Sequence, residues 1–144
     1  MPEVKFHMRG LAMINLFDKN SEIMAVVFSA NELTEPGKFF VTKPGESMQV
    51  AVMSHRKSST INRHYHPPQE RNIDLTAEVI IVLNGKLRLR IFELDGTPVW
   101  DGILISNSVA LLLRGGHAFE ALADCKFIEV KQGPFDSLKD KIHY

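Results

Sequence analysis

Short apolar stretches alternate with turn residues along most of the chain from about residue 38 onward. Within residues 86–94, Leu87, Leu89 and Ile91 alternate with two arginines, which is the period of a half-buried strand. Many short strands separated by frequent turns predict an all-β sandwich or barrel. The expected strands are residues 39–42, 48–53, 79–83, 86–94, 109–113 and 126–130, with one more beginning at residue 99.

Two dipeptides give the clearest turn signals. Asn84-Gly85 favours a type I′ hairpin because both residues tolerate a positive φ, and Asp95-Gly96 marks another turn. The pattern is less regular before residue 38. Residues 21–33 hold a Glu, a Met and an Ala that favour a short helix, but also a Val-Val-Phe run that favours a strand. A strand is the preferred interpretation.

The composition is that of an ordinary single domain. With 144 residues, 44% of them hydrophobic and 24% charged, the chain can bury a core of its own. A formal net charge of +0 provides no basic excess for nucleic acid or an acidic membrane surface. The single cysteine is Cys125, the N-terminus lacks the apolar core of a signal peptide, and no apolar run could span a bilayer. We therefore expect a cytoplasmic protein without a membrane partner.

The run at residues 79–83 is apolar on both of its faces, so both must be covered. A second sheet or a partner subunit would cover the outer face. The absence of net charge permits self-association, and we expect a homodimer.

A His-x-His pair carries the most distinctive chemistry. His64 and His66 lie in a stretch expected to be a strand, where residues two apart point to the same face, so both imidazoles can reach one point. Thr60 and Asn62 share that face, and such a polar face fits either a ligand site or a solvated surface. Pro67-Pro68 then ends the strand, because neither proline can donate to a sheet ladder.

Two further residues would complete a metal site with nitrogen and oxygen ligands. Glu78 is expected at the start of an apolar strand beside that of the histidine pair, and His117 follows two glycines. A carboxylate and a third imidazole beside the pair would give four ligands for one ion. The other histidines, His7, His55 and His143, are expected to be surface or core residues.

The spacing resembles the cupin superfamily, whose motifs read G-x5-H-x-H-x3,4-E-x6-G and G-x5-P-x-G-x2-H-x3-N. The resemblance covers roughly residues 40–135 and rests on His64-x-His66, Glu78-x6-Gly85 and His117. It implies a double-stranded β-helix, or jelly-roll barrel, in which His64, His66, Glu78 and His117 ligate one divalent ion. Fe, Mn, Ni, Co and Zn all suit that ligand set.

The choice of carboxylate stays open in the sequence. Residues 67–77 separate His66 from Glu78, a longer gap than the family pattern allows. Glu70 satisfies the shorter spacing but lacks the glycine seven residues later and belongs to a proline-led loop. Glu78 is therefore the preferred ligand, and Glu70 is a rival ligand or a group at the mouth of the site.

The end of the chain is similar to the closing segment of small single-domain bacterial cupins, including the WbuC-like group associated with surface-polysaccharide gene clusters. The similar segment is Glu129-Val130-Lys131-Gln132-Gly133-Pro134-Phe135-Asp136. We expect one cupin domain over residues 1–144. Its parts would be an N-terminal extension at about 1–37, a barrel at about 38–135 and a C-terminal tail at 136–144.

An open coordination position on such an ion polarises a carbonyl or hydroxyl group, or activates water or dioxygen. We expect a metal-dependent enzyme of isomerase, epimerase or dioxygenase type that acts on a small molecule such as a sugar or an oxo-acid. Glu70 would accept a proton, and Arg71, Arg88 and Arg90 would contact an anionic substrate. The alternatives are a non-catalytic barrel that binds a metal or small ligand, and a metal-free structural barrel.

Overall fold

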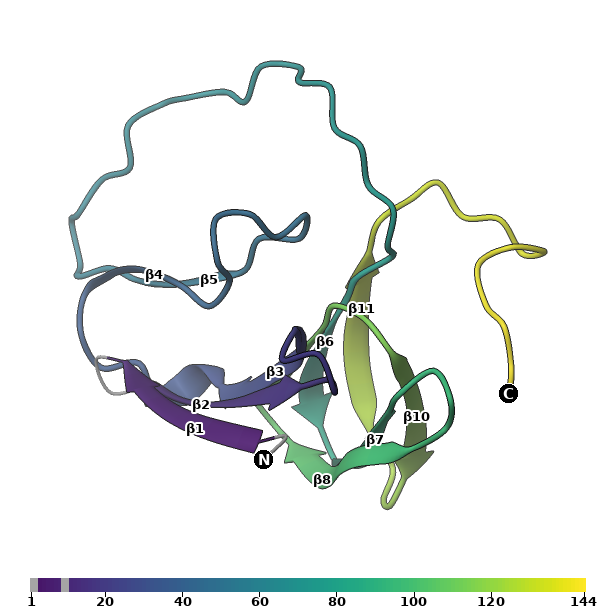
Figure 1. Ribbon diagram of the computed structural model, residues 1–144. Coiled ribbons are helices and arrows are strands. Elements are labelled where there is room, and N and C mark those ends of the chain that lie inside the picture. Colours follow the sequence, from purple (N-terminus) through teal and green to yellow (C-terminus); the bar gives the residue numbers. More distant parts are fainter. Residues whose placement is uncertain (1–2, 9–10) are drawn as a thin grey trace.

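A computed structural model describes residues 3–8 and 11–144, and its elements are almost all strands (Figure 1). The side chain of His7 lies outside the described part. The strands are β1 (Glu3–Met8), β2 (Leu11–Phe17), β3 (Ile23–Ser29), β4 (Gly37–Phe40), β5 (Ala51–Ser54), β6 (Glu78–Asn84), β7 (Lys86–Phe92), β8 (Pro98–Ile105), β9 (Ser108–Leu112), β10 (Gly116–Ala121) and β11 (Lys126–Lys131). One short 3₁₀ turn, η1 (Ala30–Glu32), follows β3. The predicted all-β class is confirmed.

The strands form three antiparallel sheets. A large sheet has the order β1-β2-β3-β9-β6-β11, a small sheet has the order β10-β7-β8, and β4 pairs with β5 in a hairpin. The small sheet packs on one face of the large sheet through a shared core, and the hairpin packs on the other. The described part of the chain is therefore a sandwich with an additional hairpin layer.

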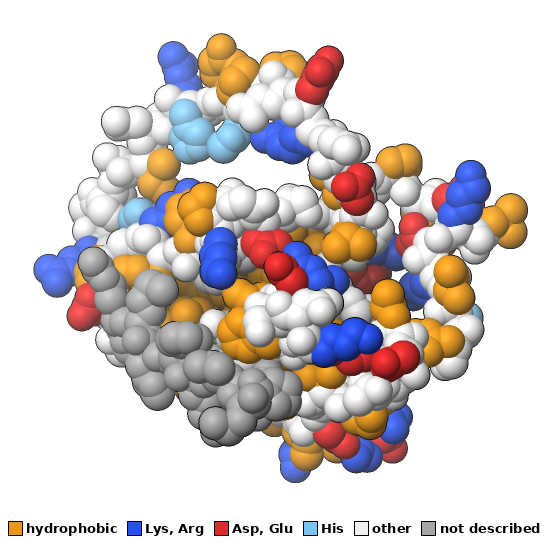
Figure 2. All heavy atoms as spheres, in the orientation of Figure 1, with side chains coloured by type: hydrophobic (Ala, Val, Ile, Leu, Met, Phe, Trp, Pro, Cys, Tyr) orange, Lys and Arg blue, Asp and Glu red, His pale blue; other side chains and the backbone are white. Residues whose placement is uncertain are grey.

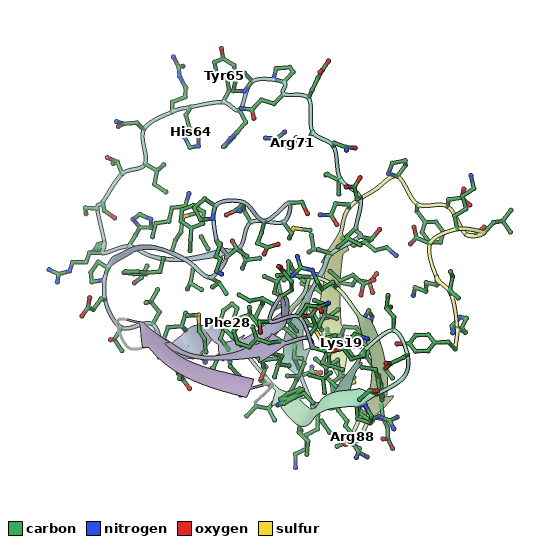
Figure 3. The ribbon with its side chains drawn as sticks, viewed as in Figure 1. Lys19, Phe28, His64, Tyr65, Arg71 and Arg88 are labelled. Carbon is green, nitrogen blue, oxygen red and sulfur yellow. The ribbon has the colours of Figure 1, made fainter. Side chains whose placement is uncertain are left out.

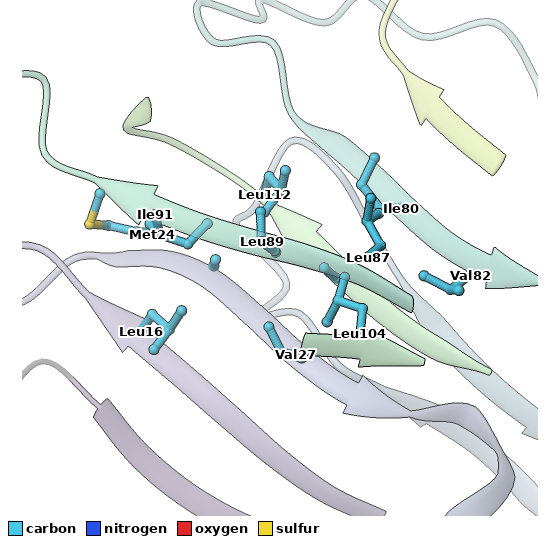
Figure 4. Close-up of a cluster of buried hydrophobic side chains, with 12 residues drawn as sticks. Leu16, Met24, Val27, Ile80, Val82, Leu87, Leu89, Ile91, Leu104 and Leu112 are labelled. Carbon is cyan, nitrogen blue, oxygen red and sulfur yellow. The ribbon is translucent and has the colours of Figure 1, made fainter. Parts of the chain in front are cut away.

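The core between the two sheets comes from alternate residues of each strand. Leu87, Leu89 and Ile91 of β7 point inward and are at most 2% exposed, as the alternation predicted. Ile80 and Val82 meet them from β6 of the large sheet (Figure 4). Burying a side chain of this kind contributes about 1.5–3 kcal/mol. This cluster is what holds the two sheets together.

The opposite face of the large sheet carries a second apolar cluster. Val79, Val109 and Leu111 are buried there beneath residues of β5 and of the loop between β4 and β5, including Val41 and Val52. The need to cover the apolar run on both faces is thus met within one chain, by the small sheet on one side and the hairpin on the other.

The chain changes sheets at Asn84-Gly85, so the predicted type I′ hairpin is wrong. β6 belongs to the large sheet and β7 to the small one, and only Gly85 has a positive φ (86°). A Cβ at Gly85 would overlap the backbone at Asp124 and Cys125, so this corner needs a glycine. The hairpin at Asp95-Gly96 does form, and it joins β7 to β8.

Residues 11–29 contribute two strands, β2 and β3, to the large sheet. β3 lies between β2 and β9 in the large sheet, so the strand interpretation of residues 21–33 is confirmed for residues 23–29, while residues 30–32 form the 3₁₀ turn η1. Leu16, Met24 and Val27 contribute to the core between the sheets.

The stretch around the histidine pair is not a strand, which corrects the sequence interpretation. Residues 55–77 contain no helix or strand and form a long arch that leaves the body after β5 and returns at β6 (Figure 1). Its polar side chains do not suit a hydrophobic core, and its two prolines lack the N–H groups that a sheet ladder needs. Among the described residues, no helix has the length and apolar character needed to cross a membrane.

Candidate metal centre

Glu78 and His117 meet at one open edge of the sandwich. Glu78 begins β6 and is paired with the inward-facing Leu112, while His117 of β10 is paired with the inward-facing Ile91. Directly paired residues in antiparallel strands share a face, so both side chains point between the sheets. Glu78 Oε2 lies 3.1 Å from His117 Nε2. The sandwich therefore brings together two residues that are far apart in sequence.

The Glu78 carboxylate is buried with an incomplete set of partners. Its side chain is 9% exposed, against 29% for His117. Although Oε2 contacts the imidazole, it accepts no well-aligned hydrogen bond. The contact with His117 lowers the pKa of Glu78, burial opposes that shift, and Lys131 and Lys141 reinforce it. His117 is thus the main partner of this carboxylate, but the contact is poorly aligned, and a cation would satisfy the buried anionic oxygen more fully.

The spacing of the two atoms also suits shared coordination of an ion. Donor atoms about 2.0–2.2 Å from one metal ion lie about 3 Å apart when they subtend a right angle. The observed 3.1 Å between Glu78 Oε2 and His117 Nε2 matches that separation. The same 3.1 Å is also the distance of an ordinary carboxylate–imidazole contact, so the pair could supply two ligands of a metal ion but does not by itself form a metal site.

A second polar group lies beside this pair and involves the C-terminal tail. Lys131 is the direct cross-strand neighbour of Glu78. Its Nζ lies 2.6 Å from Asp140 Oδ2 and 3.7 Å from Glu129 Oε1, and the side chains of Lys131 and Asp140 are 17% and 12% exposed. The Lys131 ammonium lowers the pKa of Asp140. This ion pair ties the tail to the edge of the sandwich where Glu78 lies.

Aromatic rings extend from His117 along the inner face of the small sheet. The His117 ring lies 5.3 Å from the Phe119 ring, and Phe119 lies 5.9 Å from Phe127 on β11 (centroid distances). Phe119 also packs against the core between the sheets. Phe127 is paired with Val82, four residues along β6 from Glu78, so of these two rings Phe119 is the one next to the Glu78 and His117 pair.

His64 and His66 lie on the arch, exposed to solvent. Their ring centroids are 5.3 Å apart with the rings at 72°, and His64 points into the space that the arch encloses while Tyr65 points away (Figure 3). His64 Nδ1 donates to the backbone carbonyl of Asn62 at 2.9 Å. A neutral imidazole in that tautomer has a free lone pair on Nε2, which is the form that ligates metals.

The arch and the body remain apart. Figure 2 shows an opening between them, with histidine side chains on the inner side of the arch. Within residues 3–8 and 11–144, no group of three or more His, Cys, Asp or Glu side chains is arranged to hold a metal ion. The structure thus joins Glu78 with His117 but does not join them with the histidine pair. Glu70 also lies exposed on the arch.

The three arginines suggested as anion contacts have different surroundings. Arg71 lies on the arch and donates to Gln69 Oε1 at 3.2 Å. Arg88 lies on the outer face of the small sheet, where its guanidinium makes two hydrogen bonds with Asp101 and a third with Glu120. These partners account for its charge, as on an ordinary solvated face.

Arg90 lies on that same outer face, and its Nε is buried without a hydrogen-bond partner.

The sequence interpretation missed Lys131 and Asp140. The alternation along residues 126–131 could have placed Lys131 on the inner face with Glu129, but the return of Asp140 to that face is a tertiary contact.

A comparison of the chain with protein-family models, with curated proteins and with solved structures finds no match.

Proposed function

We propose that this chain is a metal-binding protein of the cupin type. In this proposal Glu78 and His117 are two preformed ligands of a divalent metal ion, and His64 and His66 supply two more from the arch. The observation that carries the proposal is the buried Glu78 Oε2, which lacks an aligned donor and lies 3.1 Å from His117 Nε2. The lowered pKa of Glu78 supports it, because the carboxylate is then anionic near neutral pH and ready to bind a cation.

The length of the arch permits the two halves to meet. A chain spans up to about 3.3–3.6 Å per residue, so residues 67–77 can bridge roughly 40 Å between His66 and Glu78. Loops this long without secondary structure are uncommon in small domains and are usually functional or disordered. Coordination free energy would offset the entropy lost when the arch is ordered.

A bound divalent ion would supply Lewis-acid polarisation of a substrate oxygen, or activation of water or dioxygen. Around it, the chain would provide the Lys131 and Asp140 ion pair as a polar neighbour and the Phe119 ring, next to His117, as an apolar one. This combination suits a small polar substrate with an anionic or oxo group. We therefore propose a metal-dependent enzyme acting on a sugar or an oxo-acid, with Fe, Mn, Ni, Co or Zn as its ion.

Metal content tests the proposed site directly. Protein purified without a metal-affinity resin should hold about one divalent ion per chain by elemental analysis, or should bind one tightly in calorimetric titration with Mn²⁺ or Zn²⁺. Glu78→Gln and His117→Ala should abolish tight binding, and His64→Ala should weaken it by at least the roughly 10–100-fold that loss of an outer-shell partner costs, because a ligand itself is removed. His55→Ala is the matched control, because His55 is another exposed histidine of the same segment.

Two results would contradict the proposed site. Unchanged metal binding in both Glu78→Gln and His117→Ala would show that neither residue is a ligand. Loss of binding in Glu70→Gln together with full binding in Glu78→Gln would reassign the carboxylate to the arch.

Activity of the metal-loaded protein tests the proposed reaction class separately. We expect the metal-loaded protein to turn over at least one member of a panel of sugars and oxo-acids. Turnover is measured by product analysis and by oxygen uptake. Oxygen uptake would distinguish dioxygenase from isomerase chemistry. A protein that holds its ion and turns over no member of the panel would be a non-catalytic binding protein.

A further inference from the structure

We propose that a pocket between β2, β3 and β8 binds a small amphipathic amine. The pocket has a volume of about 390 Å³ and is lined by Ile14, Val27, Trp100, Leu104 and Glu32, among others. It shares no lining residue with the Glu78 and His117 edge. The apolar body of the ligand would lie between the two sheets, with its ammonium group at Glu32.

The packing of β8 explains the apolar walls. Trp100 and Leu104 are paired with the inward-facing Ile91 and Leu87 of β7, so they too face the large sheet. Gly102 lies between them, and a Cβ there would overlap the indole ring. The indole therefore lies over Gly102 of its own strand, on the β8 wall of the pocket.

The size of the pocket suits a ligand of moderate length. An apolar cavity of about 150 Å³ accepts benzene, and ligand sites commonly measure about 300–1,000 Å³. A pocket of about 390 Å³ is thus large enough for an alkyl chain of several carbons or a small ring system.

Glu32 is the charged residue among those that line the pocket, and it is exposed at the rim, so it favours a cation there. The Glu32 carboxylate accepts one long hydrogen bond, 3.3 Å from the Ala12 amide, and has no ion-pair partner among the described residues. Ser108 Oγ already accepts from the Ile105 amide at 3.0 Å. An ammonium group at the rim would pair with this carboxylate through a charge-assisted hydrogen bond.

Trp100 makes the test direct because it is the only tryptophan of the chain. The full-length protein is titrated with n-octylammonium, n-octanoate and n-octanol while indole fluorescence is followed, and calorimetry gives the stoichiometry. We expect a saturable change with n-octylammonium at one site per chain, and about tenfold weaker binding of n-octanoate, as one charge-assisted contact implies.

Two variants separate the pocket from general surface binding. Glu32→Gln should bring the affinities of the amine and the carboxylate within about threefold of each other, whereas Glu35→Gln, at an exposed acid outside the pocket, should leave the tenfold preference intact. Ala12→Leu, which fills the pocket from β2, should weaken all three probes. Binding at many sites, equal binding of n-octanoate in the unaltered protein, or an unchanged preference in Glu32→Gln would overturn the proposal.

Discussion

Removing the imidazole that contacts Glu78 should destabilise the metal-free protein in a pH-dependent way. In His117→Ala, the Glu78 carboxylate stays mostly buried but loses its nearest partner. An uncompensated polar or charged group of this kind costs about 1–3 kcal/mol. Because the deletion also admits water through a site that is 29% exposed, we expect a loss of about 2 kcal/mol rather than the larger values for fully buried pairs.

The direction with pH follows from the pKa of Glu78. Contact with His117 lowers this pKa below the ordinary value of 4.5, so the ionised carboxylate favours the folded state above that pH. That contribution is lost as the pH falls through the folded-state pKa. The difference in stability between the unaltered protein and His117→Ala should therefore be full at pH 7 and clearly smaller at pH 4.

Urea unfolding in the presence of a chelator measures this difference. With a slope of about 2 kcal/mol per molar urea, a loss of about 2 kcal/mol lowers the midpoint by about 1 M. Glu78→Gln and the double variant complete a double-mutant cycle. The interaction free energy between the two substitutions should be about 1 kcal/mol. A midpoint shift below about 0.25 M at pH 7, or one that grows toward pH 4, would refute the reasoning.

Three further perturbations test other parts of the fold. Leu89→Ala removes a fully buried side chain between the sheets and should cost about 2–5 kcal/mol in urea unfolding, and a loss under 1 kcal/mol would contradict the described core. Gly85→Ala should cost more than about 2 kcal/mol, because a Cβ there is both strained and overlapped, whereas Gly96→Ala, with a similar φ but open space, should cost about 1 kcal/mol. Asp140→Asn should release the C-terminal tail, seen as faster amide exchange at residues 138–144. In the unaltered protein the tail should loosen only as the pH falls below the usual range of an aspartate, because Lys131 lowers the pKa of Asp140, and equal exchange rates in the variant and the unaltered protein would exclude this anchor.

Much of the fold could be predicted from local pattern. The alternation along β7 identified its buried face, since a period of two places every second side chain on one side of a strand. Asp95-Gly96 identified the β7–β8 turn for a similarly local reason. Asn84-Gly85 misled because the same dipeptide can serve a corner between two sheets, and the choice depends on which strands pair, a non-local property.

The candidate site divides along the same line. The sequence by itself determined the residue types, the polar character of residues 60–66 and the position of Glu78 at the start of an apolar strand. Only the tertiary structure decided that Glu78 meets His117 across two sheets and that His64 and His66 stand apart on an arch. The spacing of residues along one strand follows directly from the sequence, because side chains alternate between its two faces. Contacts between sheets depend on how the sheets pack on a shared core, and the spacing of residues within one segment does not specify that packing.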